Sequence, residues 1–395
     1  MKIILFVWWF IQLIIGFNLI FPIVLSLLNL FFRRKDFAKS ENKPEPDYAL
    51  IVATYEQTQQ LPDVVASILK MNYSNYLVYI VADNCDISGL NFSDERIILL
   101  RPDEILASNT RSHFYAIKNF KRSHLRLAII DNDNLVDPEY LNELNKYFSQ
   151  GYEAVQGLRK AKNLDTSYAC LDAARDIYYH YYDGKMLFGA GSSATLSGSG
   201  MAFSLSLYQE SLGHLDITGA GFDKVLQHAI VSKGYRIAFN ENAVVYDEKT
   251  SEKEQLVKQR SRWINTWFRY FKFGFLLLFQ GITKFNWNQF LFGLVLLRPP
   301  LFIFLILSVV FLVINLWIQP AIALIWFAGI CIFILGFLLA LFKSSVDRRI
   351  IKSLKNIPVF VFYQIISLLS AGKANKLSVA TKHNYRNASG SKDEL

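Results

Sequence analysis

The chain is poor in cysteine and in charge. Its three cysteines, Cys85, Cys170 and Cys331, are odd in number and show no metal-ligand spacing, which argues against a zinc site and fits a reducing compartment. Charged residues make up only 19% of the 395 residues, whereas apolar residues make up 52%, and no internal repeat or long low-complexity run is visible. A length of 395 residues allows one large soluble domain together with membrane elements, and length alone would also allow two or three domains. The excess of apolar residues indicates that membrane elements are present.

The N-terminal apolar run is long enough to cross a membrane. Ile3 to Phe32 is nearly free of charge and ends in Arg33-Arg34-Lys35, and a membrane helix needs about 20 apolar residues. The run is too long for a secretory signal, and no small-residue cleavage site follows it. We therefore expect an uncleaved membrane helix, with a kinked or re-entrant segment as the alternative because of Asn18 and Pro22.

Two further candidate spans lie near the C-terminus. They cover Phe290 to Trp317 and Ala321 to Phe342, and Arg298-Pro299-Pro300 interrupts the first. An arginine inside a membrane is costly unless it faces protein or a polar cavity. We therefore expect the helix to begin after Pro300, which leaves Arg298 at the interface. Ile357 to Ser370 is apolar but too short to span comfortably, so we expect it to lie at the interface.

The basic residues predict the orientation of the chain in the membrane. They flank the apolar segments at Arg33, Arg34, Lys35, Lys343, Arg348, Arg349, Lys352 and Lys355. The positive-inside rule places the polar middle in the cytoplasm, attached to the cell inner membrane. Contacts with anionic lipid headgroups explain the net charge of +9 without a nucleic-acid partner. The final Lys392-Asp393-Glu394-Leu395 matches a lumenal retrieval signal, but this orientation makes the match a coincidence.

The polar middle alternates between strand-like and helix-like segments. The strand-like runs are Tyr48–Ala53, Leu77–Ala82, Ile97–Leu100, Leu125–Ile130 and Ala154–Gly157. The helical stretches between them are Gln60–Met71, Arg111–Lys121 and Pro138–Ser149. This alternation predicts an α/β domain with a mostly parallel sheet covered on both faces. Ligands of such sheets bind beyond the carboxyl ends of the strands.

Asp131-Asn132-Asp133 follows a predicted buried strand. Two carboxylates one residue apart at a strand end can share Mg²⁺ or Mn²⁺, which prefer oxygen ligands and often share them with substrate phosphates. Such a metal would neutralise a leaving diphosphate. The alternative is a solvated acidic turn before a helix that starts at Asp137-Pro138.

Asp83 closes an earlier predicted strand. A carboxylate at this place can accept hydrogen bonds from the base or ribose of a nucleotide. Aspartate is also an ordinary turn residue, so a turn cap explains Asp83 equally well.

Asp223 comes just before the helical stretch Val225 to Val231. An acceptor hydroxyl must lose its proton as it attacks a sugar carbon, and a positioned carboxylate can serve as that base. The alternative is a carboxylate that complements the dipole of the helix N-terminus.

Gln259-Arg260-Ser261-Arg262-Trp263 is the most specific pattern. Arg262 offers a planar guanidinium that suits diphosphate oxygens, and Gln259 lies about one helical turn earlier. Trp263 offers a flat apolar face that can stack on a sugar ring. An amphipathic helix at the membrane edge is the alternative, because more aromatic residues follow directly.

Together these motifs resemble those of the membrane-anchored family 2 glycosyltransferases of the cellulose synthase and hyaluronan synthase type. That family combines three separated aspartate motifs with Gln-x-x-Arg-Trp. The resemblance runs from about Tyr48 to Trp267, more than half of the chain. It also covers Asp137-Pro138-Glu139-Tyr140, Leu196-Ser197-Gly198-Ser199-Gly200-Met201 and Val245-Tyr246-Asp247-Glu248-Lys249.

The resemblance implies a Rossmann-like GT-A domain, a UDP-sugar donor, Mg²⁺ or Mn²⁺ as cofactor, and inversion at the anomeric carbon. The uridine would be held by Ala53, Thr54, Tyr55, Glu56 and Asp83.

The resemblance also implies roles for the later motifs. Asp131 would hold the diphosphate, and Asp131 and Asp133 would hold the metal. Asp223 would be the catalytic base. Gln259 and Arg262 would bind the donor, and Trp263 would bind the acceptor.

Three features depart from the family pattern. Phe222 stands where a glutamate usually precedes the catalytic aspartate. Asn109-Thr110-Arg111-Ser112-His113 replaces a Gly-Lys element that reaches toward the nucleotide, so either Arg111 or His113 substitutes for its lysine or the contact is lost. The membrane part is thinner than in polymer-secreting members, which favours a single transfer to a lipid, or a partner subunit or second copy that completes a pore.

We therefore expect five parts: a transmembrane anchor (1–35), a cytoplasmic glycosyltransferase domain (46–250), interface helices (251–285), a transmembrane hairpin (286–343) and a basic C-terminal segment (344–395). The leading function is transfer to a glycan or lipid acceptor in polysaccharide synthesis. The alternatives are a single-addition lipid glycosyltransferase and a degenerate nucleotide-sugar-binding subunit of a secretion complex.

Overall fold

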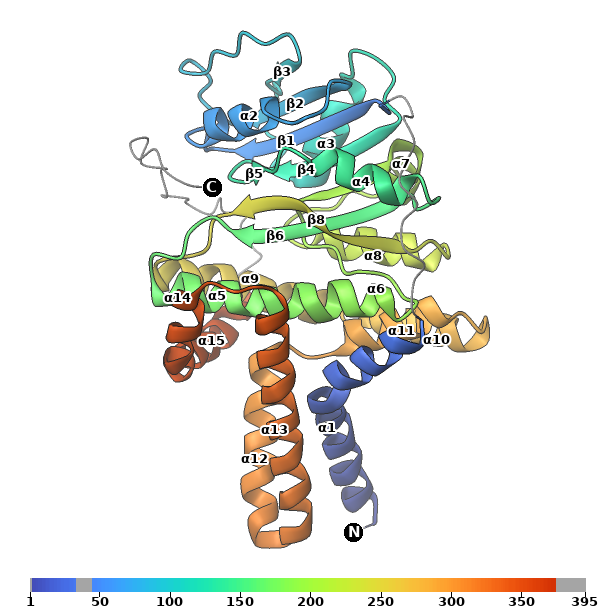
Figure 1. The fold of residues 1–395 in the computed structure, drawn as a ribbon, viewed down its shortest axis with the longest axis vertical. Coiled ribbons are helices and arrows are strands. Elements are labelled where there is room, and N and C mark those ends of the chain that lie inside the picture. The colour runs from blue at the N-terminus through green and yellow to red at the C-terminus, as the bar shows by residue number, and fades with distance from the viewer. Residues whose placement is uncertain (1, 33–44, 374–395) are drawn as a thin grey trace.

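The computed structural model describes residues 2–32 and 45–373 (Figure 1). A sheet with covering helices forms the upper part in this view, a layer of helices lies beneath it, and apolar helices extend downward from that layer. The basic run at Arg33–Lys35 and the terminal Lys392–Leu395, on which two sequence-based predictions rest, lie outside the described residues.

The sheet has eight strands in the order β3-β2-β1-β4-β7-β6-β8-β5. Their bounds are β1 Tyr48–Tyr55, β2 Tyr76–Asp83, β3 Ile97–Leu100, β4 Arg126–Asp131, β5 Leu135–Val136, β6 Ala154–Ala161, β7 Met201–Ser204 and β8 Ile237–Asp247. The central strands are buried on both faces, as in β1, whose residues from Tyr48 to Val52 have no exposed surface. Continuous apolar runs suit strands that helices cover on both sides.

The sheet is mixed, and the prediction of a mostly parallel sheet needs correction at β7. This strand runs antiparallel to both β4 and β6, and β5 runs antiparallel to β8, whereas the other pairings are parallel. The sequence pattern did not reveal β7, because it is short and follows glycines and serines. The pattern also missed β8, because the polar residues Asn240, Glu241 and Asn242 divide its apolar runs.

The registers bring the predicted polar groups to one edge of the sheet. Tyr55 at the end of β1 pairs with Asp83 at the end of β2. Ala53 pairs with Asp131 at the end of β4. The carboxyl ends of these parallel strands therefore present their polar residues together, as a doubly covered α/β sheet predicts.

Helices cover the sheet and support this edge. They are α2 Leu61–Leu69, α3 Asn109–Lys118, α4 Tyr140–Phe148, α7 Leu205–Leu212 and α8 Phe222–Ser232. Buried apolar residues repeat at helical spacing in α2, α4, α7 and α8, as with Leu61, Val64, Val65 and Ile68 of α2.

A second layer of helices lies under the sheet. Its main member begins as α5 Ser167–Tyr179, continues through the π-helical turns His180–Met186 and ends as α6 Leu187–Gly189. Beside it lie α9 Lys253–Tyr270, α10 Lys272–Thr283 and α11 Trp287–Leu297 (Figure 1). π-Helical turns inside longer helices are frequent at functional sites.

The apolar helices α1 Lys2–Phe31, α12 Leu301–Ile318 and α13 Pro320–Lys343 extend away from the domain (Figure 1). All three are long and apolar enough to cross a membrane. Helix α1 is continuous through Pro22. Its Gln12 accepts hydrogen bonds from Asn315 Nδ2 of α12 (2.7 Å) and Trp326 Nε1 of α13 (2.8 Å). These polar contacts within an apolar bundle tie the three helices together.

The break before α12 lies where the sequence predicts it, since α11 ends at Leu297 and α12 begins at Leu301. The fourth candidate span, Arg348–Ser370, contains α14 Arg348–Ser353 and α15 Ile357–Ser370. Figure 1 shows α15 beside α9 at the base of the domain rather than alongside α12 and α13. Phe360 of α15 is buried there against Leu256 of α9, and the interfacial position of this segment stays a prediction.

Candidate functional site

A large cavity of about 1220 Å³ lies between the sheet, the α5–α9 layer and the apolar helices. Its walls include Asp131 and Asp133 after β4, Asp223 of α8, and Gln259 and Trp263 of α9. Three motifs that lie between positions 131 and 263 of the sequence therefore meet at one space.

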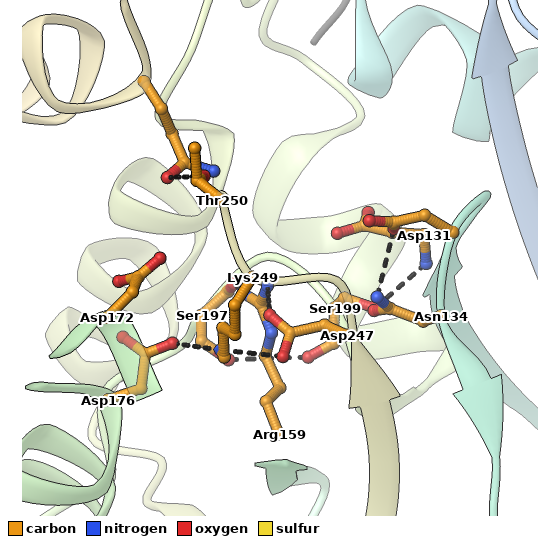
Figure 2. A network of polar contacts seen from close by, with 12 residues as sticks. Asp131, Asn134, Arg159, Asp172, Asp176, Ser197, Ser199, Asp247, Lys249 and Thr250 are labelled. Atoms are coloured by element: carbon orange, nitrogen blue, oxygen red, sulfur yellow. Dashed lines mark hydrogen bonds and ion pairs between the residues drawn. The ribbon is translucent and has the colours of Figure 1, made fainter. Parts of the chain in front are cut away.

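Asp131 and Asp133 are held by bonds around the end of β4. The backbone N–H of Asp131 donates to Ser199 Oγ (2.9 Å), and Ser199 Oγ donates to Asn134 Oδ1 (2.6 Å) (Figure 2). Asn134 Nδ2 donates to a carboxylate oxygen of Asp133 (3.1 Å). Ser199 belongs to the glycine-rich stretch 196–201, so that stretch fixes the position of the two carboxylates.

The predicted uridine-binding residues form a separate group at the ends of β1 and β2. None of Ala53, Thr54, Tyr55, Glu56 and Asp83 is among the residues that line the large cavity. Their role toward a nucleotide stays a prediction.

The side chain of Asp83 is engaged by the backbone. Its carboxylate accepts hydrogen bonds from the backbone N–H groups of Leu106 (2.9 Å) and Ala107 (2.7 Å), and Asp83 is only 1% exposed. These contacts match the capping alternative for Asp83 and fix the loop before α3.

Thr54 connects the nucleotide-side group to the metal-side group. Asn132 Nδ2 donates to Thr54 Oγ1 (2.7 Å), and Thr54 Oγ1 donates to the carbonyl of Gln57. The residue between the two carboxylates is therefore bound to the end of β1.

Asp223 lies in the first turn of α8 and faces the cavity. Lys224 Nζ contacts Asp223 Oδ2 (2.9 Å) and donates to the carbonyl of Leu196 (3.0 Å). Gly221 precedes the helix with a φ of 102°, and an added Cβ there would lie 2.6 Å from the Tyr270 ring. Glycine is required at this point because α8 and α9 approach closely and the backbone is left-handed.

Two of the departures from the family pattern contact each other. Phe222 is buried, and its ring lies edge-on to the ring of His113 (5.2 Å between centroids). His113 is itself buried, with Nδ1 2.7 Å from the Tyr208 hydroxyl, and burial lowers its pKa to about 3. His113 thus packs in the interior and is not placed to contact a nucleotide, while Arg111 pairs with Asp216 at the surface (2.6 Å).

The Gln-x-x-Arg-Trp segment lies in the middle of α9. Gln259 Oε1 accepts a hydrogen bond from Thr250 Oγ1 (3.2 Å). Burial lowers the pKa of Arg262. Trp263 is 37% exposed, and the guanidinium carbons of Arg260 and Arg175 lie 4.1 and 4.4 Å from its ring centre. Such stacked cations orient an aromatic ring.

A buried network of ion pairs lies between these motifs (Figure 2). Lys249 contacts both Asp176 and Asp247 (2.7 Å to the latter), and Asp247 also pairs with Arg159. Burial alone would raise the pKa of Asp176, but the neighbouring Lys249 and Arg175 cations hold it well below its usual range. The network therefore keeps its carboxylates charged in the interior.

Two further buried ion pairs join the second layer to its neighbours. Arg260 of α9 pairs with Asp172 of α5. Arg298 pairs with Asp183 in the π-helical turns (2.6 Å) and donates to the Tyr178 hydroxyl (3.1 Å). Arg298 is only 9% exposed, so it faces protein just before α12, and its position at the membrane interface stays a prediction. Buried charges persist only when they are paired in this way.

The donor set fits a divalent metal whose remaining ligands come from a substrate. Within residues 2–32 and 45–373, no group of three or more His, Cys, Asp or Glu side chains is arranged to hold a metal ion. Asp131 and Asp133 supply two carboxylates that line the cavity. Mg²⁺ is commonly bound by one or two carboxylates together with substrate phosphates, so this pair would hold it jointly with a nucleotide.

Our reading of the sequence missed most of the buried network, although α5 carries a signal for it. Asp172, Arg175, Asp176, Tyr179 and Asp183 recur at helical spacing and all line the cavity. A polar stripe within an otherwise apolar helix indicates a lined cavity or an ion-pair network.

Comparisons with known proteins were consistent with this architecture. A family model described as "Glycosyltransferase like family 2" matches residues 44–266. The structure of the mannosyltransferase PcManGT from Pyrobaculum calidifontis in complex with GDP-Man and Mn²⁺ is similar, with a TM-score of 0.54, 15% sequence identity and coverage of 91% of this chain and 98% of that chain. At this identity the likeness shows the GT-A fold alone.

S. aureus TarS (residues 1–349) gives a TM-score of 0.40 at 12% identity, covering 83% of this chain and 90% of that chain. No curated protein matches the chain.

Proposed function

The chain belongs to the glycosyltransferase like family 2, and we propose that it is an inverting, metal-dependent hexosyltransferase. It would move a sugar from a UDP-sugar to an acceptor at the cytoplasmic face of the cell inner membrane. One observation carries the proposal: Asp131, Asp133, Asp223 and the Gln259–Trp263 segment line the same cavity. A chance set of motifs would have no reason to meet at one space.

The proposed roles follow from the chemistry of each group. Asp131 and Asp133 hold the divalent metal together with the diphosphate, and the bound metal supplies charge neutralisation of the leaving group. Asp223 takes the proton from the acceptor hydroxyl. Lys224 bonds both Asp223 and the Leu196 carbonyl and so fixes the orientation of that base.

Helix α9 supplies the remaining contacts. Arg262 and Gln259 bind diphosphate oxygens, because a guanidinium and an amide donate hydrogen bonds to them. Trp263 stacks on the acceptor sugar or headgroup, in an orientation that Arg175 and Arg260 maintain.

The test is release of nucleoside diphosphate by the full-length protein in membranes of its source cell. A panel of UDP-sugars, with GDP-mannose added, is supplied with Mg²⁺, with Mn²⁺ or with EDTA. We expect UDP release from at least one UDP-sugar, lost with EDTA and restored by either metal. Absence of release with every donor contradicts the proposal, and release from GDP-mannose alone contradicts the uridine assignment.

A further inference from the structure

The large cavity has two parts of opposite character. One part is the polar space around Asp131, Asp223 and the Gln259–Trp263 segment, and the other extends between α12, α13 and α15. The side chains that line this second part, here called the apolar limb, include Phe302, Val310, Ile334, Phe337 and Phe360. Gln364 is the single polar side chain that α12, α13 and α15 contribute to the wall.

The apolar limb runs along the hairpin helices and opens on their outer side. Leu301 and Val310 both line it, and nine residues of α-helix span roughly 14 Å, so it reaches about half of the length of α12. Val310 is 43% exposed and Ile334 is 50% exposed. The limb is therefore open toward the surface that faces lipid when α12 and α13 span a membrane.

The lining excludes a path for a growing polysaccharide. A sugar polymer carries several hydroxyl groups on each unit, and each needs water or a polar partner when it is buried. Phe, Ile, Leu and Val side chains provide neither. An alkyl or isoprenoid chain, in contrast, gains free energy from every methylene that such a surface covers.

We propose that the acceptor is a membrane lipid that presents a hydroxyl group, and that its hydrocarbon chain lies in the apolar limb. This inference rests on the proposed function and specifies its acceptor. The lipid enters sideways from the bilayer, and its hydroxyl reaches Asp223 at the junction of the two parts. The apolar limb would hold the hydrocarbon chain of the lipid, and the polar part of the cavity would hold the donor. The acceptor oxygen therefore reaches the sugar while the hydrocarbon chain stays out of water.

In the transfer step, every bond, electron pair and proton is accounted for by the acceptor, the UDP-sugar and Asp223. The acceptor oxygen forms a bond to the anomeric carbon while the bond from that carbon to the diphosphate oxygen breaks. The leaving UDP takes the electron pair, and Asp223 takes the hydroxyl proton. The products are a lipid glycoside of inverted configuration and UDP.

A hydroxyl suits the junction better than a lipid phosphate does. Three of the cations that line the cavity already have carboxylate partners: Lys224 pairs with Asp223, Arg260 with Asp172 and Arg298 with Asp183. A phosphate would have to compete with those carboxylates for its counter-ions. A neutral hydroxyl needs only a base, which Asp223 supplies.

Adjacent residues give matched variants for the test. Ile334 lines the limb, whereas its neighbour Leu335 does not, and both are at least half exposed. Val310 lines the limb, whereas Val313 does not, and the two are about equally exposed (43% and 49%). Ile334→Trp and Val310→Trp fill the limb, and Leu335→Trp and Val313→Trp add the same ring to the lipid-facing side of the same helices.

The experiment supplies source-cell membranes carrying each variant with the radiolabelled UDP-sugar that supports UDP release. The product is partitioned between chloroform–methanol and water and then treated with mild acid. We expect label in the organic phase, reduced at least tenfold by Ile334→Trp and Val310→Trp and changed less than twofold by Leu335→Trp and Val313→Trp. Binding of UDP should be equal in all five proteins.

Four other outcomes would contradict a specific part of the proposal. UDP release with label in a water-soluble or ethanol-insoluble product overturns the lipid acceptor and leaves the proposed function intact. Equal loss in the lining and control variants overturns the placement of the chain. Mild-acid release of the label as a free monosaccharide overturns the hydroxyl acceptor in favour of a lipid phosphate. Absence of UDP release in wild-type membranes overturns the proposed function itself.

Discussion

Two parts of this molecule hold their carboxylates in different ways. At the edge formed by β1 and β2, Asp83 is bonded by the backbone N–H groups of Leu106 and Ala107. In the layer beneath the sheet, Asp172 and Asp176 are bonded by the side-chain cations of Arg260 and Lys249. Backbone donors move only with their loop, but side-chain cations can exchange partners.

This difference separates a rigid side of the molecule from an adaptable one. The β1–β2 edge suits recognition of a ligand part that stays the same through the reaction, such as a nucleotide base. The ion-pair layer suits the part where charge changes, because its side-chain cations line the cavity and can stabilise charge that develops there. The predictions below test this division.

The largest effect is expected at the proposed base. Asp223→Asn removes the proton acceptor but keeps the shape of the side chain, so transfer should fall by about 10²–10⁴-fold, with UDP affinity little changed. Asp216→Asn, an exposed carboxylate paired with Arg111, is the control and should transfer sugar normally. Initial rates and UDP titration measure both; a collapse of UDP affinity in Asp223→Asn would place this residue on the donor instead.

Breaking one buried ion pair should destabilise the layer strongly. Asp172→Asn leaves the buried Arg260 guanidinium without its counter-charge, and loss of one partner from a buried pair costs about 3–5 kcal/mol. Thermal unfolding in detergent should show a clear drop for Asp172→Asn and none for the surface variant Asp216→Asn. Equal melting temperatures would mean that the layer carries no structural role.

The carboxylates after β4 should affect the metal requirement. Asp131→Asn and Asp133→Asn each remove a charged ligand, so the Mn²⁺ concentration for half-maximal UDP release should rise by at least roughly 10-fold, which is the loss seen when even a partner of a metal ligand is removed. Asn132→Ala, between them, removes the bonds to Thr54 Oγ1 and to the Gln57 carbonyl but no carboxylate, and it serves as the control. An unchanged metal requirement in both aspartate variants would exclude this pair as the ligands.

The smallest effect concerns acid sensitivity on the rigid side. Burial lowers the pKa of His113 to about 3, well below the value of about 6.5 in an unfolded chain. Below pH 6.5 the unfolded state therefore binds a proton that the folded state does not, and stability falls by about 1.4 kcal/mol per pH unit. His113→Gln should weaken this dependence by about 2 kcal/mol between pH 6.5 and pH 5.

Chemical unfolding in detergent at the two pH values measures the change. The matched variant His214→Gln alters an exposed histidine and should leave the dependence as it is in the wild type. A parallel drop in stability for His113→Gln and the wild type would show that His113 takes up its proton in the folded state.

The sequence pattern predicted the first half of the sheet well and the second half less well. The strands from β1 to β4 are continuous apolar runs, so both their position and their parallel pairing follow from local pattern. The strand β7 carries only four residues, and its antiparallel place between β4 and β6 depends on contacts from distant segments. The fold class was confirmed, whereas the reversal at β7 came from the structure.

For the site, the sequence identified the chemistry, and the structure defined its surroundings. The motifs around Asp131, Asp223 and Gln259–Trp263, and their order along the chain, indicated the family. Each motif is a short contiguous stretch, so it can be recognised without the fold. The meeting of Asp83 with the 106–107 loop, of Phe222 with His113 and of Arg298 with Asp183 depends on packing between elements far apart in sequence. Local pattern contains no information on such partners.

By itself, then, the sequence determined an α/β glycosyltransferase domain with apolar helices at both ends, since residue type, spacing and hydrophobic length are local properties. The tertiary structure alone decided that the polar motifs share one cavity with the apolar side chains of α12, α13 and α15. The physical reason is that a cavity is the space left where separate elements pack together, and its walls come from segments that no single stretch of sequence contains.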